Sequence, residues 1–117
     1  MTSQGSAYGR FQRALEKGNP LLAWTAAQEV GELTLPDALK LVVAVREDPK
    51  LYDRASTRWH ARWELANPDV AVPESSFVLG ALAALPGPRG ALVAEALAAF
   101  FARRGQPDLA DALGRLT

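Results

Sequence analysis

Residues 49–66 hold three arginines, two of the three tryptophans and the only histidine of the chain, residue types that could bind anions, stack on rings or transfer protons. The arginines recur at every fourth residue, so at about 3.6 residues per turn they form one strip along a helix. Guanidinium groups spaced in this way could clamp phosphates or the carboxylates of a protein partner. The two tryptophans, also four residues apart, fall on an adjoining face and could add ring surface to the same contact. The candidate partner-binding residues are therefore Arg54, Arg58, Arg62, Trp59 and Trp63.

The same arginines and tryptophans also have a purely structural interpretation. The arginine stems could pack along the edge of the core beside Leu51 and Leu65, with their head groups paired to carboxylates of a neighbouring helix. Tryptophans at helical spacing among apolar residues are more often core anchors than ligand contacts. Lys+Arg and Asp+Glu number 13 each, so no net charge draws the chain to nucleic acid. We expect a protein partner first, and nucleic acid bound by the arginine strip as the alternative.

His60 and Glu64 lie one turn apart, and Asp53 belongs to the same strip of the expected helix. Three such side chains could hold a metal ion or act as an acid and a base. Tetrahedral zinc, however, requires three or four good ligands, and one histidine with carboxylates is a poor set. We expect instead a solvated helix face on which His60 forms a hydrogen bond with Glu64, with no bound metal and no cofactor.

The sequence gives little support for nucleophilic catalysis. It has no cysteine and one histidine, and its serines lie only near the N-terminus, at Ser56 and at the pair Ser75 and Ser76. No glycine-rich phosphate-binding motif is present. We therefore expect a protein that is not an enzyme.

Helix-capping residues divide the chain into the segments that must position these side chains. Glycines are predicted to end helices at Gly18, Gly31 and Gly105, and Asn19 and Asp48 precede prolines that begin helices. The apolar periodicity between these signals is that of helices, and no pair of strands is predicted. The expected helices cover residues 7–17, 20–30, 35–46, 49–66, 73–85, 88–104 and 107–116. The fold class is thus all-α, a compact bundle of about six or seven short helices.

Two of these segments are unusually apolar. The helix over 20–30 is apolar nearly all round, so we expect it to be buried at the centre of the bundle. Residues 77–101 are apolar on more than one face of two helices, which is difficult to bury within one small domain. This C-terminal hairpin could bind a second copy as a homodimer, or the second and seventh helices could cover it.

At 117 residues the chain is long enough for one domain. We expect a polar, disordered tail over residues 1–6 and a single all-helical domain over 7–117. The N-terminus lacks the layout of a secretory signal, and no apolar run reaches the ~20 residues that span a bilayer. These features predict a cytoplasmic protein with no membrane partner.

Prolines and aromatic residues recur with an offset of 37 residues. The matched pairs are Pro36 and Pro73, Pro49 and Pro86, and Trp63 and Phe100. Residues 36–104 thereby resemble helical-hairpin repeat proteins of the tetratricopeptide or HEAT-like kind, which implies stacked helical hairpins. A plain helical bundle with proline-initiated hairpins is the alternative. The chain is also similar to small Ala/Arg-rich helical proteins of GC-rich bacteria, a similarity that implies no activity. Taken together, the sequence predicts a small helical protein-interaction module.

Overall fold

The computed structural model describes residues 6–116, and these residues form seven α-helices without a β-strand. The helices are α1 (Ala7–Glu16), α2 (Pro20–Val30), α3 (Leu35–Ala44), α4 (Pro49–Ala66), α5 (Val72–Ala84), α6 (Gly90–Arg103) and α7 (Pro107–Ala112). The predicted all-α bundle is thus confirmed. Within the described residues, no helix is both long and apolar enough to cross a lipid bilayer.

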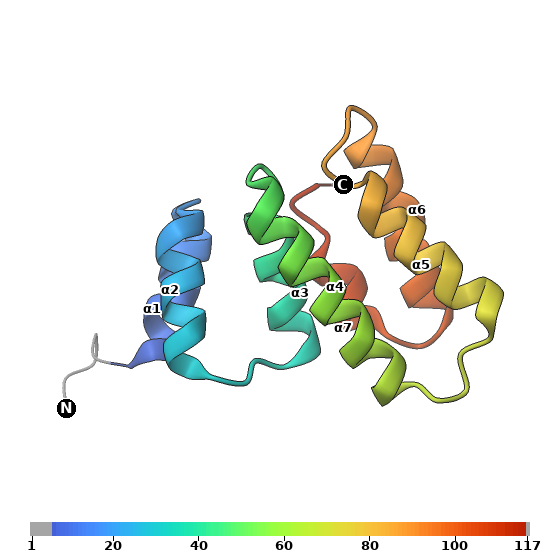
Figure 1. Cartoon of the computed structure of the whole chain (residues 1–117), viewed down its shortest axis with the longest axis horizontal. Coiled ribbons are helices and arrows are strands. Elements are labelled where there is room, and N and C mark those ends of the chain that lie inside the picture. Colours follow the sequence, from blue (N-terminus) through green and yellow to red (C-terminus); the bar gives the residue numbers. More distant parts are fainter. Residues whose placement is uncertain (1–5, 117) are drawn as a thin grey trace.

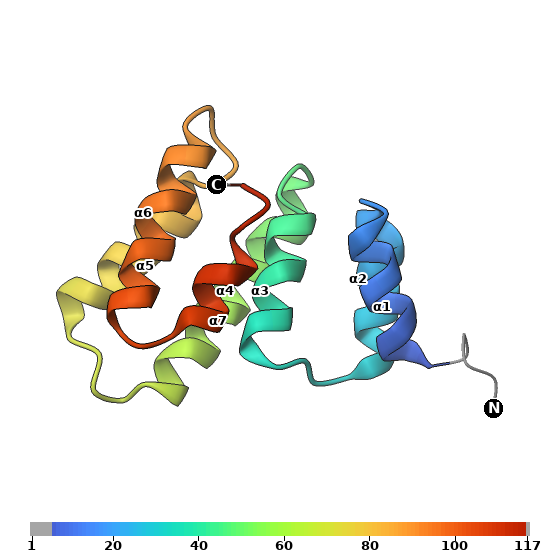
Figure 2. The same ribbon diagram turned by 180° about the vertical axis from the view of Figure 1, so that it is seen from behind.

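Three antiparallel helix pairs lie side by side along the long axis of the molecule (Figure 1). The pairs α1–α2, α3–α4 and α5–α6 follow one another in chain order, with the first at one end and the last at the other. The short α7 lies behind, between α3 and α6, as the view from the back shows (Figure 2). As a result α4 stands near the middle, with α2 on one side and the α5–α6 pair on the other.

Side-chain caps begin four of the helices. Asn19 and Asp48 accept hydrogen bonds of 3.1 Å from backbone N–H groups in the first turns of α2 and α4, as the sequence predicts. Thr34 caps α3 in the same way. Of the tail predicted over residues 1–6, residues 1–5 lie outside the described part of the chain. Ser6 does not belong to a tail, because its hydroxyl caps α1.

Glycines end three helices, as predicted. The φ angles of Gly18, Gly31 and Gly105 are 68°, 90° and 78°, a left-handed conformation that residues with side chains rarely adopt. Each glycine therefore lets the chain leave its helix and reverse direction within a few residues.

The last two helices differ from their predicted bounds. α6 begins at Gly90 rather than at residue 88, because the preceding residues form turns held by hydrogen bonds such as that from the Gly90 N–H to the Gly87 carbonyl, 3.1 Å. A Cβ at Gly90 would lie 2.4 Å from the Leu85 carbonyl oxygen, so this tight turn requires a glycine. α7 ends at Ala112 because the bonds that follow span three residues and form turns instead of helix.

The apolar side chains pack into two clusters. The larger one surrounds Trp59 and Trp63 of α4 and includes residues of α3, α5, α6 and α7. The ring of Phe101 meets both indoles edge-on, with centroid separations of 5.9 and 5.8 Å. The smaller cluster, around Phe11, joins α1 and α2 to α3. The N-terminal helix pair therefore shares a small core with α3 and adjoins the rest of the molecule mainly through that helix.

The expectation that the second helix is buried at the centre of the bundle is wrong. Leu21 and Leu22 of α2 are 66% and 59% exposed. α2 lies at one end of the molecule, where only α1 and α3 pack closely against it. Its buried residues are the small Ala23, Ala26 and Ala27, and this close packing leaves the leucines facing solvent.

Candidate functional site

A groove of about 520 Å³ lies between α2 and α4, with α3 beneath it. α2 and α4 run in the same direction here, and α3 runs in the opposite direction between them (Figure 1). Ala38, Leu41 and Val42 of α3 form an apolar floor. Trp24 and Gln28 of α2 line one wall, and the three arginines of α4 line the other.

The structure thus brings Arg54, Arg58 and Arg62 to one wall of one groove, as the four-residue spacing predicts. Their head groups do not pair with carboxylates of a neighbouring helix. Arg62 donates a hydrogen bond of 2.7 Å to the backbone carbonyl of Leu33. The guanidinium carbon of Arg54 lies 6.0 Å from the ring centroid of Trp24.

Arg58 differs from its two neighbours. Its side chain is exposed and makes no hydrogen bond or ion pair with any residue in the described part of the chain. Glu32 is the one carboxylate among the residues that line the groove, so three arginines and one glutamate leave a formal charge of 3 − 1 = +2. The groove therefore combines an apolar floor with a cationic wall whose central charge lacks an internal partner.

The two tryptophans predicted to bind the partner are core residues instead. Trp59 and Trp63 are both buried, and their rings stack with a centroid separation of 6.2 Å. The indole N–H of Trp59 donates to the Leu35 carbonyl at 2.9 Å, and that of Trp63 donates to the side-chain oxygen of Gln106 at 3.3 Å. Both polar groups are thus satisfied inside the protein. Trp59 borders the groove, but it is only 1% exposed.

Trp24 is an aromatic residue of the groove that is not among the predicted partner-binding residues. It is only partly buried, and its ring lies beneath the guanidinium group of Arg54. Thirty positions separate these two residues in the sequence, 54 − 24. No periodicity within one helix could have paired them, because the contact depends on how α2 and α4 are placed.

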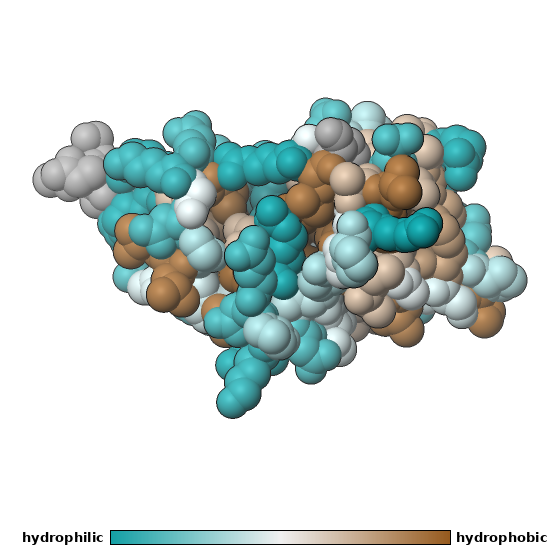
Figure 3. Space-filling model, turned by 90° about the horizontal axis from the view of Figure 1, so that it is seen from above, coloured by the Kyte–Doolittle hydropathy of each residue, from teal (hydrophilic) through white to brown (hydrophobic). Residues whose placement is uncertain are grey.

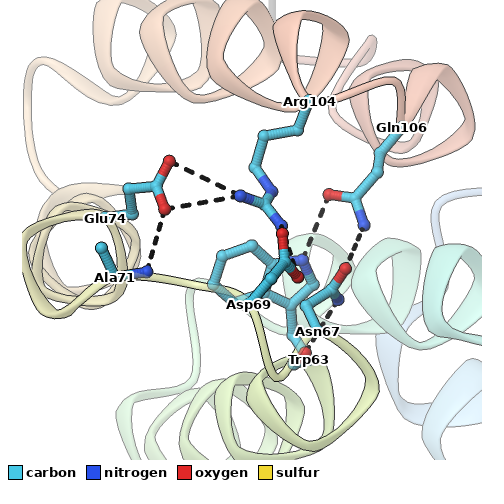
Figure 4. A network of polar contacts seen from close by, with 7 residues as sticks. All are labelled: Trp63, Asn67, Asp69, Ala71, Glu74, Arg104 and Gln106. Atoms are coloured by element: carbon cyan, nitrogen blue, oxygen red, sulfur yellow. Dashed lines mark hydrogen bonds and ion pairs between the residues drawn. The ribbon is translucent and has the colours of Figure 1, made fainter.

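A network of polar contacts joins the C-terminal end of α6 to the α4–α5 connection (Figure 4). The side chain of Arg104 is 15% exposed and forms ion pairs with Asp69 at 3.2 Å and with Glu74 at 3.4 Å. Its guanidinium carbon also lies 5.6 Å from the ring centroid of Trp63. Glu74 in turn accepts a hydrogen bond from the backbone N–H of Ala71 at the start of α5. Arg104 therefore orders the α4–α5 connection and is not available to a ligand.

A second chain of hydrogen bonds lies beside it (Figure 4). Gln106 donates to the side-chain oxygen of Asn67 at 3.0 Å, and Asn67 donates to the Trp63 carbonyl at 2.8 Å. Because Trp63 donates back to Gln106, these three residues close a ring that fixes the end of α4 against α7.

His60 does not lie on a solvated helix face, contrary to the expectation. It is buried against α5, where its Nε2 lies 3.1 Å from the carbonyl oxygen and 3.2 Å from the hydroxyl of Ser75. Its Nδ1 is 3.8 Å from a Glu64 oxygen, too far for a hydrogen bond. The Ser75 hydroxyl donates to the other Glu64 oxygen.

This serine, histidine and glutamate resemble a catalytic arrangement only in composition. The Ser75 carbonyl can only accept a hydrogen bond, so the assignment that satisfies it places a proton on Nε2 of His60. In that tautomer His60 cannot take the proton of the Ser75 hydroxyl, which points to Glu64 instead. The cluster accordingly holds α4 to α5.

A second hollow of about 520 Å³ lies between α1, α3 and α7. These helices lie toward the viewer when the molecule is seen from behind (Figure 2). Many of its charged groups have partners in the protein. Asp37 accepts a hydrogen bond of 2.8 Å from Tyr8, which raises the pKa of that phenol, and Arg115 donates to the Leu15 carbonyl. Acidic and basic residues both line this hollow, whereas the charged residues of the α2–α4 groove are mainly arginines.

Among residues 6–116, no three acidic or histidine side chains gather in a way that could hold a metal ion. Comparison with protein-family models, with curated proteins and with solved structures finds no match to this chain. The resemblance to hairpin-repeat proteins therefore stays a prediction.

Proposed function

We propose that this protein is a small, non-catalytic helical interaction module whose α2–α4 groove binds an acidic segment of a protein partner. The observation that carries the proposal is Arg58, an exposed cation at the middle of the groove wall without an internal partner among the described residues. A cation left unpaired beside an apolar floor is well placed to pair with a carboxylate of a partner.

The shape of the groove supports a peptide segment as its ligand. Two helices that run in the same direction above an apolar floor form a trough suited to one further helix or extended segment. Apolar side chains of that segment would lie on Trp24 and Ala38, which are partly exposed in the groove, and its acidic side chains would face Arg54 and Arg58. Apolar burial would supply affinity, and the ion pairs would fix orientation.

Nucleic acid is the alternative ligand of the same strip. It is less favoured, because the Arg62 head group is engaged by the Leu33 carbonyl and the chain carries no net charge. Few phosphates could be neutralised by the remaining guanidinium groups. Binding to random duplex that falls steeply with salt would favour this alternative over a peptide ligand.

The test compares the Arg58→Glu variant with the wild-type protein. The partner is captured, its bound segment is made as a synthetic peptide, and the dissociation constant is measured by titration. We expect Arg58→Glu to weaken peptide binding by about tenfold or more, because an attraction becomes a repulsion. Arg89→Glu is the matched control, since Arg89 is also exposed but lies at the start of α6, away from the groove.

Circular dichroism and urea unfolding of Arg58→Glu should match those of the wild-type protein. Equal peptide binding by both proteins would overturn the proposal. Loss of binding together with a large loss of stability would mean that Arg58 is structural, which contradicts its lack of contacts.

Self-association through the C-terminal hairpin is a second candidate function, and a separate observation favours it. Phe77 and Leu79 of α5 and Leu92 of α6 are 42%, 51% and 61% exposed. Hydrophobic residues spread over this end of the molecule in the view from above (Figure 3). Exposed apolar surface of this kind is typical of an interface. Absolute mass from light scattering on a size-exclusion column tests it, and a monomer at every concentration would contradict it.

A further inference from the structure

The outward face of the α5–α6 pair carries very few charges. Of the exposed side chains on these two helices, only Glu95 and Arg103 are charged, and both belong to α6. The other outward residues of α6 are small or apolar. The outward face of α6 comprises Leu92, Glu95, Ala96, Ala99, Ala102 and Arg103, all of them exposed.

The two charges are placed symmetrically about Ala99. Glu95 lies four residues before it and Arg103 four residues after it. At about 3.6 residues per turn, positions four before and four after a residue lie on its own face, one turn to each side. Opposite charges at equal distances from a centre are complementary to a second copy of the same helix turned end for end.

We propose that α6 packs antiparallel against α6 of a second copy of this chain, about a two-fold axis at Ala99, with reciprocal Glu95–Arg103 ion pairs. This inference rests on the proposed self-association and specifies its surface and its symmetry. A two-fold axis at Ala99 places Ala99 against itself and Ala96 opposite Ala102 of the second copy. Glu95 then faces Arg103 twice, once on each side of the axis.

The residue types along the seam fit this packing. Alanines at the centre let two helices approach to the short end of the usual range, about 8 Å between axes. A parallel arrangement in the same register would oppose Glu95 to Glu95 and Arg103 to Arg103, so the charges disfavour it. Leu92 lies on the same face, and exposed Phe77 touches Phe100 of α6 with ring centroids 5.3 Å apart, so apolar surface borders the seam.

The proposed dimer leaves the α2–α4 groove open. The groove lies on the α2 side of α4, and the α5–α6 pair lies on the other side of α4 (Figure 1). Each dimer would therefore present two grooves, and a partner with two acidic segments would bind more tightly than one with a single segment.

Charge reversal at the two residues tests the proposal. The dimer dissociation constant is measured by sedimentation equilibrium for the wild-type protein and for Glu95→Arg, Arg103→Glu and the double variant. Each single reversal creates two like-charge contacts, so we expect each to weaken the dimer by about tenfold or more. The double variant restores opposite charges and should regain most of the affinity. Arg89→Glu, an exposed change outside the face, should leave the constant unchanged.

Three results would overturn the inference. They are a monomer at all concentrations, a dimer unaffected by the single reversals, and a double variant no better than the single ones. The first also removes self-association as a function, whereas the other two leave a dimer formed by another face. Arg58→Glu should dimerise like the wild-type protein, which separates this test from that of the groove.

Discussion

Arg54 lies over the indole ring of Trp24, with its guanidinium carbon 6.0 Å from the ring centroid, and this contact links α4 to α2 across the groove. Trp24 is also the only tryptophan that is not buried, because Trp59 and Trp63 stack inside the core. The fluorescence of Trp24 should therefore respond to changes in the groove, and that of Trp59 and Trp63 to changes in the core. A ligand that enters the groove must alter the surroundings of Trp24.

Fluorescence quenching by acrylamide should therefore distinguish the three tryptophans. We expect one accessible component and two protected ones, and Trp24→Phe should remove the accessible component. Arg54→Ala uncovers the ring and should increase its quenching. Arg58→Ala touches no ring and serves as the control. Accessible emission that persists in Trp24→Phe would contradict the buried positions of the other two indoles.

Arg104 should contribute more to stability than its neighbour Arg103. Replacing Arg104 by Met removes two ion pairs and a cation–π contact from a largely buried position, so we expect a loss of about 1–3 kcal/mol. Arg103→Met, at an exposed position, should change the free energy of unfolding by less than about 0.5 kcal/mol. Urea unfolding at low protein concentration measures both. Equal effects would mean that the Arg104 network contributes no net stability.

The helix ends and the Arg104 network differ in how far they could be predicted from the sequence. Helix ends at Gly18, Gly31 and Gly105 are set by interactions within a few residues, so they could be predicted correctly. The pairing of Arg104 with Asp69 joins residues 104 − 69 = 35 positions apart and depends on how whole helices are placed. No local pattern contains that information.

Burial was harder to predict for the same reason. The apolar composition of α2 suggested a central helix, but composition does not show which helices end up at the edge of a bundle. The four-residue spacing of the arginines correctly placed them along one wall, since that is a property of α4 alone. The contacts of Arg54 and Arg62 depended on α2 and on the segment that precedes α3, and they could not be predicted.

Two glycines should respond in opposite ways to substitution by alanine. Gly31 has φ of 90°, so Gly31→Ala forces a strained conformation and should cost about 1 kcal/mol. Gly80 lies inside α5, where an added Cβ would have no neighbouring atom within 4 Å, so Gly80→Ala should gain about 0.5–1 kcal/mol from helix propensity. Thermal unfolding of both variants checks the signs. A Gly31→Ala variant more stable than the wild-type protein would contradict the positive φ angle of Gly31 at the end of α2.

Tyr52 should make the stability of the fold depend on alkaline pH. Its hydroxyl is buried and donates a hydrogen bond of 2.5 Å to the Leu82 carbonyl, and burial raises the pKa of this phenol above its usual value. The unfolded chain releases the proton near pH 10 and the folded chain does not, so the stabilising contribution is complete below about pH 10 and is lost as the pH rises further.

Tyr52→Phe separates this effect from other alkaline titrations. The variant should lose about 1 kcal/mol of stability at neutral pH, because the Leu82 carbonyl keeps only the longer hydrogen bond of 3.3 Å from the Leu85 N–H. Above about pH 10 its stability should fall less steeply than that of the wild-type protein. Tyr8 is the chain's other tyrosine, and its phenol is exposed, so Tyr8→Phe isolates Tyr52 in absorbance titrations. In that variant phenolate absorbance should rise only together with unfolding, and a reversible rise in the folded protein would show that Tyr52 ionises in place.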